Sequence, residues 1–213
     1  MKIHQLAVGE LGTNCYIVAT QKNNAMVIDA GGNAKGILQF LKENNLTLKL
    51  LLLTHAHYDH MGAVYELQQQ TGAKVVLYKD EQEILLDPTK NVAIHFIEMN
   101  EFKPVQADVL LQDGDSVVLD EVTLQVIHTP GHTKGSCVYY TDGVMFSGDT
   151  LFQQSIGRTD LYSGNMNDMK ASLKKLINLT EDYTVLPGHG NKTSLRYEKT
   201  TNPYMGTNYD DIF

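Results

Sequence analysis

L-L-L-L-T-H-A-H-Y-D-H-M-G, residues 50–62, is the stretch that decides the fold. Its first half is a short unbroken apolar run, which predicts a strand buried on both faces. Its second half places three histidines and one aspartate close together: His55, His57, Asp59 and His60. Alternate residues of an extended segment point the same way, so His55 and His57 are expected to converge on one metal ion. Asp59 and His60 point elsewhere and are expected to bind a second ion beside it.

A polar loop with surface or core histidines is the alternative to a metal site. Three of the chain's eight histidines lie in this loop. Clustered imidazoles repel one another when protonated and need partners when buried, so this density favours metal ligation.

The composition is that of an ordinary globular protein. The chain has 213 residues, of which 42% are hydrophobic and 20% charged, which is enough for one domain with a substantial core. The net charge of −8 argues against nucleic acid or an anionic membrane as the main partner. Only two cysteines occur, without a C-x-x-C pair, and no secretory signal or membrane-length apolar run is present, so a cytoplasmic location is expected.

The first half of the chain is expected to open with antiparallel strands and to continue with alternating helices and strands. Predicted strands are residues 2–8, 14–19, 25–29, 50–53 and 74–78, and predicted helices are residues 33–44, 61–70 and 80–86. Residues 91–104 show no clear pattern.

The second half is expected to form a second sheet and to end with helices. Predicted strands are residues 109–111, 116–119, 123–128, 136–141, 144–147 and 183–186, and an amphipathic helix is predicted at 167–179. Two similar halves predict an α/β fold in which two sheets pack face to face with helices outside, a four-layer sandwich. Residues 1–213 are expected to form a single domain.

Three further stretches each combine a strand end, a glycine-rich turn and one ligand-type residue. They are T-P-G-H-T-K-G-S with His132, F-S-G-D-T with Asp149, and L-P-G-H-G with His189. Glycine allows the backbone to turn tightly and to approach its neighbours. Each motif alone is a weak signal, because turn histidines and capping aspartates are common.

Taken together and in this order, the motifs resemble those of the metallo-β-lactamase superfamily, and more narrowly its glyoxalase II branch, the hydroxyacylglutathione hydrolases. The resemblance extends from about residue 14 to residue 190 and includes I-D-A-G-G with Asp29. It implies the αβ/βα sandwich of two mixed sheets, and two metal ions. The implied ligands are His55, His57 and His132 for the first ion, Asp59, His60 and His189 for the second, and Asp149 as a bridge. Asp29 is implied to accept a hydrogen bond from a ligand imidazole and fix its ring.

The same resemblance implies a binuclear hydrolase. Two ions roughly 3.5–4 Å apart would share a hydroxide that attacks the carbonyl of a thioester or ester, such as S-lactoylglutathione or a related acyl-thiol. Zinc is the first choice for these ligands, with iron or manganese also compatible. Asp149 and Asp59 are the implied catalytic carboxylates; Asp59 is a candidate for relaying a proton, although as a ligand it is largely committed to the metal.

G-R-T-D-L-Y-S-G, residues 157–164, stands where glyoxalase II binds glutathione with a lysine and a tyrosine. By that resemblance Arg158 and Tyr162 are the substrate-binding candidates, since arginine can bind a carboxylate bidentately. Thr159 and Asp160 lengthen the stretch relative to glyoxalase II. A local ion pair between Arg158 and Asp160 that stiffens the loop is the alternative.

The end of the chain departs from full-length glyoxalase II, which continues into a helical glutathione-binding domain. Only 24 residues follow His189 here, so that domain is expected to be absent. The tail tyrosines Tyr197, Tyr204 and Tyr209 are candidates for covering a smaller site, or for surface contacts.

Other members of the superfamily supply the alternative functions. A mononuclear iron persulfide dioxygenase also carries G-R-T-D and would use His57, His132 and Asp149 for its iron. A lactonase or a β-lactamase fits less well, and no cysteine stands at the Asp149 position, as it does in the thiolate-using β-lactamases. A transfer-RNA-processing nuclease is disfavoured by the acidic charge. A small-molecule substrate is therefore expected, and the sequence gives no basis for an oligomeric state.

Overall fold

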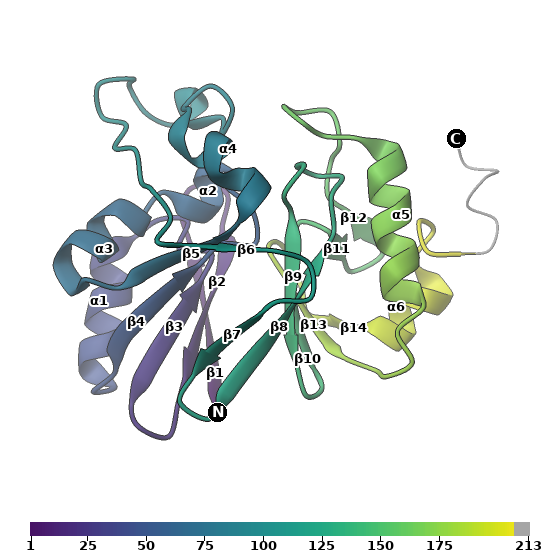
Figure 1. Cartoon of the computed structure of the whole chain (residues 1–213), viewed down its shortest axis with the longest axis horizontal. Helices are drawn as coiled ribbons and strands as arrows, with labels where there is room; N and C mark the ends of the chain where they lie inside the picture. Colours follow the sequence, from purple (N-terminus) through teal and green to yellow (C-terminus); the bar gives the residue numbers. More distant parts are fainter. Residues whose placement is uncertain (207–213) are drawn as a thin grey trace.

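Two six-stranded mixed sheets pack face to face in the computed structural model, which describes residues 1–206 (Figure 1). The first sheet has the order β1-β2-β3-β4-β5-β6. Its strands are β1 Lys2–Val8, β2 Thr13–Ala19, β3 Asn24–Ile28, β4 Thr47–Leu52, β5 Lys74–Tyr78 and β6 Val109–Leu111. β2 is antiparallel to both of its neighbours, β1 and β3, whereas β3 to β6 run parallel.

The second sheet has the order β14-β13-β10-β9-β8-β7. Its strands are β7 Ser116–Leu119, β8 Val122–His128, β9 Cys137–Thr141, β10 Val144–Gly148, β13 Thr184–Pro187 and β14 Thr193–Ser194. Only β10 and β13 are parallel neighbours. A short hairpin of β11 Leu151–Phe152 and β12 Ser155–Ile156 follows β10.

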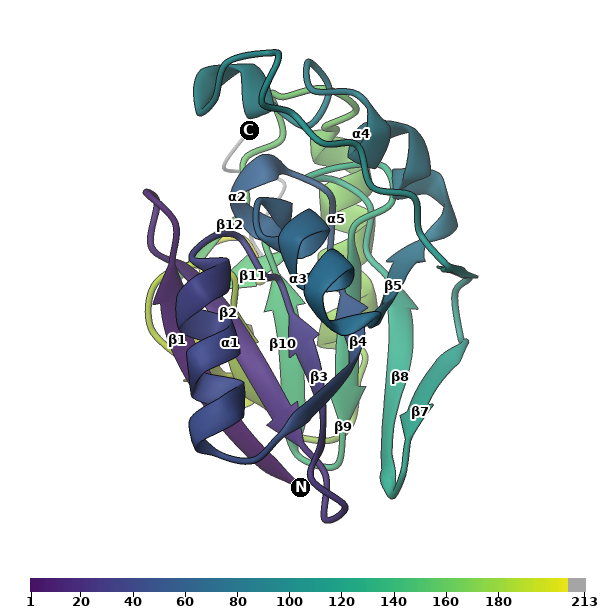
Figure 2. The same ribbon diagram turned by 90° about the vertical axis from the view of Figure 1, so that its left-hand side faces the viewer.

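Helices cover the outer faces of the two sheets. α1 (Ala34–Glu43) and α3 (Val64–Thr71) cover the first sheet, as Figure 2 shows, and α5 (Met166–Ile177) and α6 (Leu195–Thr201) cover the second (Figure 1). The four-layer αβ/βα sandwich expected from the sequence is confirmed. No helix within residues 1–206 is long and apolar enough to cross a membrane.

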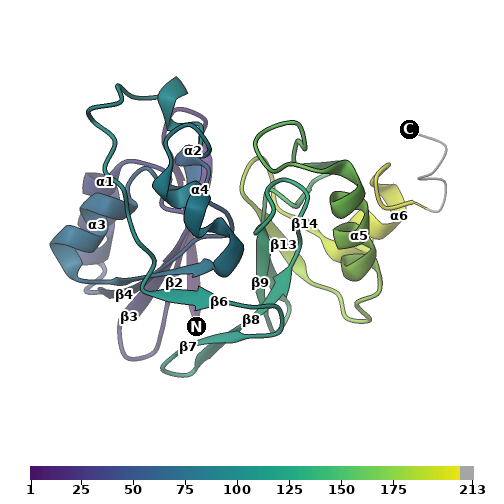
Figure 3. The ribbon, with the colours of Figure 1, turned by 45° about the horizontal axis from the view of Figure 1, so that its top comes forward.

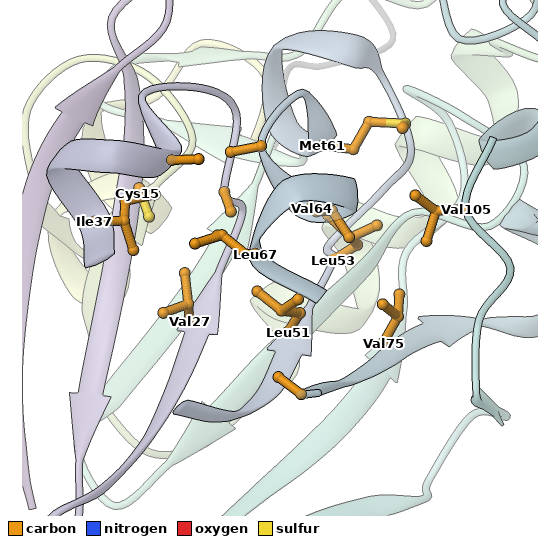
Figure 4. Packing of buried hydrophobic residues seen from close by; sticks show 14 of the residues in the cluster. Cys15, Val27, Ile37, Leu51, Leu53, Met61, Val64, Leu67, Val75 and Val105 are labelled. Carbon is orange, nitrogen blue, oxygen red and sulfur yellow. The ribbon is translucent and has the colours of Figure 1, made fainter. Parts of the chain in front are cut away.

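Three hydrophobic clusters separate the four layers. Side chains of β2 alternate between two of them, because successive residues of a strand point to opposite faces. Cys15 and Ile17 join Val27 and Leu67 in the cluster between the first sheet and its helices (Figure 4), whereas Tyr16 lies between the sheets. The third cluster joins the second sheet to α5 and α6.

One strand assignment was wrong. Residues 109–111 were expected in the second sheet, but β6 is the edge strand of the first, where Val109 pairs with Val76 of β5 in parallel. The preceding segment, residues 91–104, crosses over the end of the first sheet and returns the chain to it. Three residues carry too little local pattern to specify which sheet they join.

The helix predicted at 61–70 is interrupted. The structure has α2 (Tyr58–Met61) and α3, separated by Gly62 and Ala63. The Ala63 amide donates to the Ala30 carbonyl at 2.9 Å instead of continuing a helix. A Cβ on Gly62 would lie 2.7 Å from the Gly31 carbonyl oxygen, so this close approach needs glycine.

One edge of the sandwich collects the loops that carry the motif residues. α2 and α4 (Gln82–Leu86) stand there on one half, and the loop before α5 stands there on the other (Figure 1, Figure 3). Motifs that are far apart in the sequence therefore meet at this edge.

Candidate metal centre

Three imidazoles from two loops form the first cluster. His55 and His57 follow β4, and His132 lies between β8 and β9; all three are buried. His57 Nδ1 lies 2.8 Å from His132 Nε2, which in turn lies 3.2 Å from His55 Nε2. The nitrogens therefore converge on one point, and the group is suited to hold a metal ion.

Hydrogen bonds orient two of these rings. His132 Nδ1 donates to the Arg158 carbonyl at 2.7 Å, so its Nε2 carries the lone pair. Thr54 Oγ1 donates to Asp29 Oδ2 at 2.8 Å, so it accepts from His55 Nδ1 at 3.1 Å and leaves His55 Nε2 unprotonated. These tautomers are assigned from the hydrogen-bond network.

A second cluster lies beside the first and consists of Asp59, His60 and His189. Asp59 Oδ2 is 3.1 Å from His189 Nε2 and 3.5 Å from His60 Nε2. The two imidazole nitrogens are 3.2 Å apart. His60 does not continue the alternation of His55 and His57, because α2 begins at Tyr58 and turns the His60 side chain to the other side.

Asp149 lies between the two clusters at the end of β10. Its Oδ1 is 3.4 Å from His60 Nε2, and its Oδ2 is 3.6 Å from His132 Nε2. The same Oδ2 is 3.7 Å from His189 Nε2, so this carboxylate lies within reach of both clusters. All seven predicted ligand residues are brought together by the fold.

Asp29, at the end of β3, lies behind this centre and is buried. Its Oδ2 is 3.1 Å from His60 Nδ1, and its Oδ1 accepts from the Thr54 amide at 2.8 Å. The Asp29 carboxylate therefore contacts the ring of one predicted ligand and the loop that carries another.

The loop that carries His189 is held by residues that sequence reasoning did not single out. Asn14 Nδ2 donates to the Pro187 and Gly190 carbonyls at 3.0 Å each, and Tyr16 Oη donates to the Pro187 carbonyl at 2.7 Å. Both residues lie on β2, where they pattern as ordinary strand residues. Their contacts are more than 170 positions away in the chain, so no local signal identifies them.

The two clusters differ in protonation. Burial and the neighbouring imidazoles lower the pKa of His55 well below its usual value and that of His57 to about 3. Burial also lowers the pKa of His132, although Asp149 opposes it. The first cluster is therefore a set of neutral imidazoles.

In the second cluster the carboxylates outweigh burial. Burial lowers the pKa of His60 and of His189, but Asp59 and Asp149 raise both above the usual value. Burial acts to raise the pKa of Asp149, but the nearby imidazoles, His60 first, bring it down to about 2. In this cluster the carboxylates therefore favour the protonated form of both imidazoles.

The donor chemistry fits divalent cations. In the first cluster the unprotonated Nε2 atoms of His55 and His132 lie 3.2 Å apart, an arrangement that a cation relieves. The buried atoms His57 Nε2 and Asp149 Oδ1 have no hydrogen-bond partner. Imidazole and carboxylate ligands suit zinc and iron alike, so the ligand set does not by itself select the metal.

A cavity of about 620 Å³ opens onto the centre. His57, Asp59, His132, Asp149 and His189 form its floor, and its walls are Leu11, Val92, His95, Phe96, Arg158 and Leu161. Residues 92–96 come from the segment that showed no pattern in the sequence. Val92 has φ 59°, a left-handed conformation that is strained for a β-branched residue and is a feature of functional loops.

The two substrate-binding candidates, Arg158 and Tyr162, differ in their position relative to the cavity. Arg158 lines the cavity, but its guanidinium also binds Asp160 bidentately at 2.7 and 2.8 Å, which is the local ion pair considered as the alternative. Tyr162 is outside the cavity lining, and its hydroxyl donates to Glu83 at 2.9 Å. The Tyr162 contact links the loop before α5 to α4.

Of the histidines outside the two clusters, His95 lines the cavity and two others are packed against aromatic rings. The tail tyrosines were candidates either for covering a smaller site or for surface contacts. His4 packs edge-on against Phe40, and the ring of His128 stacks on Tyr78. Tyr197 accepts a hydrogen bond from Gln154, and Tyr204 packs against the third hydrophobic cluster. Tyr209 lies outside the described residues.

Metal binding should become weaker as the pH falls. His60 and His189 have raised pKa values in the metal-free protein, and both must lose a proton to bind a metal. Affinity at the second cluster should therefore decrease by about tenfold per pH unit for each proton displaced, while the neutral first cluster changes less. Calorimetric titration with Zn²⁺ in buffers of different ionisation enthalpy at pH 6.5 and 8 measures the protons released. Equal affinity at both pH values would contradict this charge distribution.

Comparisons with known proteins agree with the fold. Residues 8–189 match the family model of the metallo-β-lactamase superfamily. The chain is 33% identical to the hydroxyacylglutathione hydrolase GloC of Haemophilus influenzae, over 97% of this chain and 99% of that protein.

Two solved structures share the architecture. BLEG-1, a B3 metallo-β-lactamase, is 37% identical, with a TM-score of 0.87 over 96% of this chain and 99% of its own. TTHA1623 in a di-iron-bound form is 32% identical, with a TM-score of 0.83 over 94% and 99%. With a family match across most of its length and the His/Asp centre in place, the chain belongs to the metallo-β-lactamase superfamily.

Proposed function

We propose that this protein is a binuclear metal-dependent hydrolase of thioesters, acting on S-lactoylglutathione or a related acyl-thiol. The position of Asp149 is the observation that carries the proposal, because its carboxylate lies within reach of both clusters: Oδ1 is beside His60, and Oδ2 is beside His132 and His189. In this proposal His55, His57 and His132 hold one ion, Asp59, His60 and His189 hold the other, and Asp149 bridges them. Zinc is the first choice of metal, and iron is also compatible.

The residues around the centre have separate roles. Bound divalent ions supply a water of lowered pKa and polarise a carbonyl oxygen. Asp59 Oδ2 accepts a hydrogen bond from Thr13 at 3.2 Å, which fixes the carboxylate toward His189. Leu11, Val92 and Phe96 offer an apolar wall against which an acyl group can pack.

The relationship to GloC supports a thioester substrate. That relative is matched over 99% of its length, so a protein of that name is about as long as the matched region. A short chain is therefore compatible with hydroxyacylglutathione hydrolysis. Hydrolysis of S-lactoylglutathione, a neutral aryl ester and a β-lactam should be compared on one preparation. We expect the highest kcat/KM for the thioester, with loss on chelation and recovery on adding Zn²⁺; turnover of the β-lactam alone would overturn the proposal.

An iron persulfide dioxygenase is the second candidate. His57, His132 and Asp149, the three residues it would use for iron, all line the cavity floor and are therefore open to a substrate. Oxygen uptake with glutathione persulfide distinguishes it from the hydrolase.

Replacing Arg158 by alanine should raise KM several-fold for an anionic thioester and leave KM for a neutral aryl ester nearly unchanged. Arg158 is part of the cavity lining, and an arginine can bind a substrate carboxylate bidentately. Asp160→Ala is the matched control: it frees the guanidinium from its ion pair and should lower the same KM. Equal effects of Arg158→Ala on both substrates would show that the arginine only stiffens its loop.

A further inference from the structure

Glu81 is a fully buried carboxylate that is not one of the proposed metal ligands. It lies where a short 3-10 turn, Lys79–Glu81, enters α4, and its side chain has no exposed surface. A buried ionised carboxylate is costly unless donors surround it. The burial of Glu81 therefore indicates a structural or functional role.

Three donors satisfy this carboxylate. Glu81 Oε2 accepts from the Ala56 amide at 2.8 Å. Glu81 Oε1 accepts from Thr133 Oγ1 at 2.5 Å and from the Gly135 amide at 2.8 Å. Each partner gives a proton and none takes one, so the contacts suit the ionised form.

The donors belong to the two loops that carry the first cluster. Ala56 stands between His55 and His57, and Thr133 directly follows His132. One side chain thus joins the H-x-H loop after β4 to the G-H-T-K-G loop before β9. The hydrogen bonds found for Glu81 within residues 1–206 all go to these two loops, at positions next to first-cluster ligands and not next to Asp59, His60 or His189.

The surroundings are built around this contact. Thr133 gives its hydroxyl proton to Glu81, so Ser136 Oγ, 2.7 Å away, is left to donate to Thr133 Oγ1. A Cβ on Gly135 would lie 2.7 Å from Glu81 Cγ and 2.8 Å from its amide nitrogen, so glycine is required beside the carboxylate. The G-H-T-K-G motif therefore has a second glycine because Glu81 occupies that space.

We propose that Glu81 is a positioning residue for the first metal ion, fixing the two loops so that His55, His57 and His132 point their nitrogens at one site. The inference rests on the proposed ligand set. Because Glu81 contacts the loops of one cluster, its replacement should weaken the binding of one of the two metal ions. A general stabilising role would not produce that asymmetry.

Glu198 provides a matched control. It is equally buried and also accepts three hydrogen bonds, from the Gln154 amide at 2.7 Å, Thr193 Oγ1 at 2.6 Å and Asn202 Nδ2 at 2.9 Å. None of these partners lies in a loop that carries the first cluster. Glu198→Gln removes a buried carboxylate without touching the His55 and His132 loops.

The test compares wild type, Glu81→Gln and Glu198→Gln by competitive titration of Zn²⁺ against a chromophoric chelator, and by the visible absorption of Co²⁺ in the site. Glu81→Gln should lower the affinity for one of the two ions by roughly 10–100-fold, as for other residues that orient metal ligands. It should also change the Co²⁺ spectrum. Glu198→Gln should leave both affinities and the spectrum unchanged. Two wild-type affinities in Glu81→Gln, or equal losses in both variants, would overturn the inference.

A second pair of variants keeps the test independent of folding. Thr133→Val removes one donor at nearly constant volume and should lower the affinity for the same ion. Thr133→Ser keeps the hydroxyl and should keep the wild-type affinity. No difference between these two variants would also overturn the role of Glu81. Wild-type protein that binds fewer than two ions would instead refute the proposed ligand set, so the two failures are distinguishable.

Discussion

Replacing Asp149 by alanine should abolish thioester hydrolysis and reduce the metal content. The carboxylate is the group within reach of both clusters, with one oxygen 3.4 Å from His60 Nε2 and the other 3.6 Å from His132 Nε2. Residues that merely orient ligands cost about 10–100-fold in metal affinity or activity, so loss of a bridging ligand should exceed that range. Elemental analysis and turnover on the same sample measure both effects.

The isosteric variant Asp149→Asn separates ligation from packing. Asparagine keeps the volume and one oxygen but loses the negative charge, so it should retain the fold and bind metal weakly. Exposed Asp168, at the first turn of α5, is a suitable control position, and Asp168→Asn should behave as wild type. Full activity and metal content in Asp149→Ala would end the bridging assignment.

Replacing Gly188 by alanine should lose the ion of the second cluster. A Cβ at this position would lie 2.2 Å from Asp149 Oδ1 and 2.6 Å from His60 Cε1. The backbone cannot retreat easily, because the Gly188 amide donates to Gly148 and its carbonyl accepts from Asn14, both at 2.8 Å. We expect at least about 100-fold lower activity and roughly 1–3 kcal/mol lower unfolding free energy, measured by turnover, metal analysis and denaturant unfolding.

Gly190→Ala is the control from the same turn. Gly190 has φ +75°, and a Cβ added there would meet no other atom within 4 Å, so alanine costs backbone strain of about 1–2 kcal/mol without touching the centre. It should keep two metal ions and most of the activity. Wild-type metal content in Gly188→Ala would show that the Asp149 and His60 side chains can move aside, and that the geometry of the second cluster is not decisive.

Local patterns account for much of what the sequence predicted. The apolar run before His55 indicates a buried strand, and the glycine turns after other strands indicate sites where a polar side chain is presented at a sheet edge. β1, β5 and β6 have the predicted boundaries. The order of the motifs then selected the sandwich, because strand patterns alone are compatible with other α/β folds.

Long-range contacts account for what was missed. β6 joined the first sheet through pairing with β5, and α2 separated from α3 because Ala63 bonds to Ala30. Glu81 reads as an ordinary charged residue before a short helix, and only the folded chain shows that it joins two loops. The positions of Val92 and Phe96 in the cavity wall also depend on long-range contacts, because residues 91–104 show no pattern in the sequence.

The most direct test of the central claim is metal content by elemental analysis on protein purified without added metal, combined with S-lactoylglutathione turnover on the same sample. A binuclear hydrolase predicts about two ions per chain together with thioester cleavage. One iron per chain, with oxygen uptake on glutathione persulfide and no thioester cleavage, would contradict it.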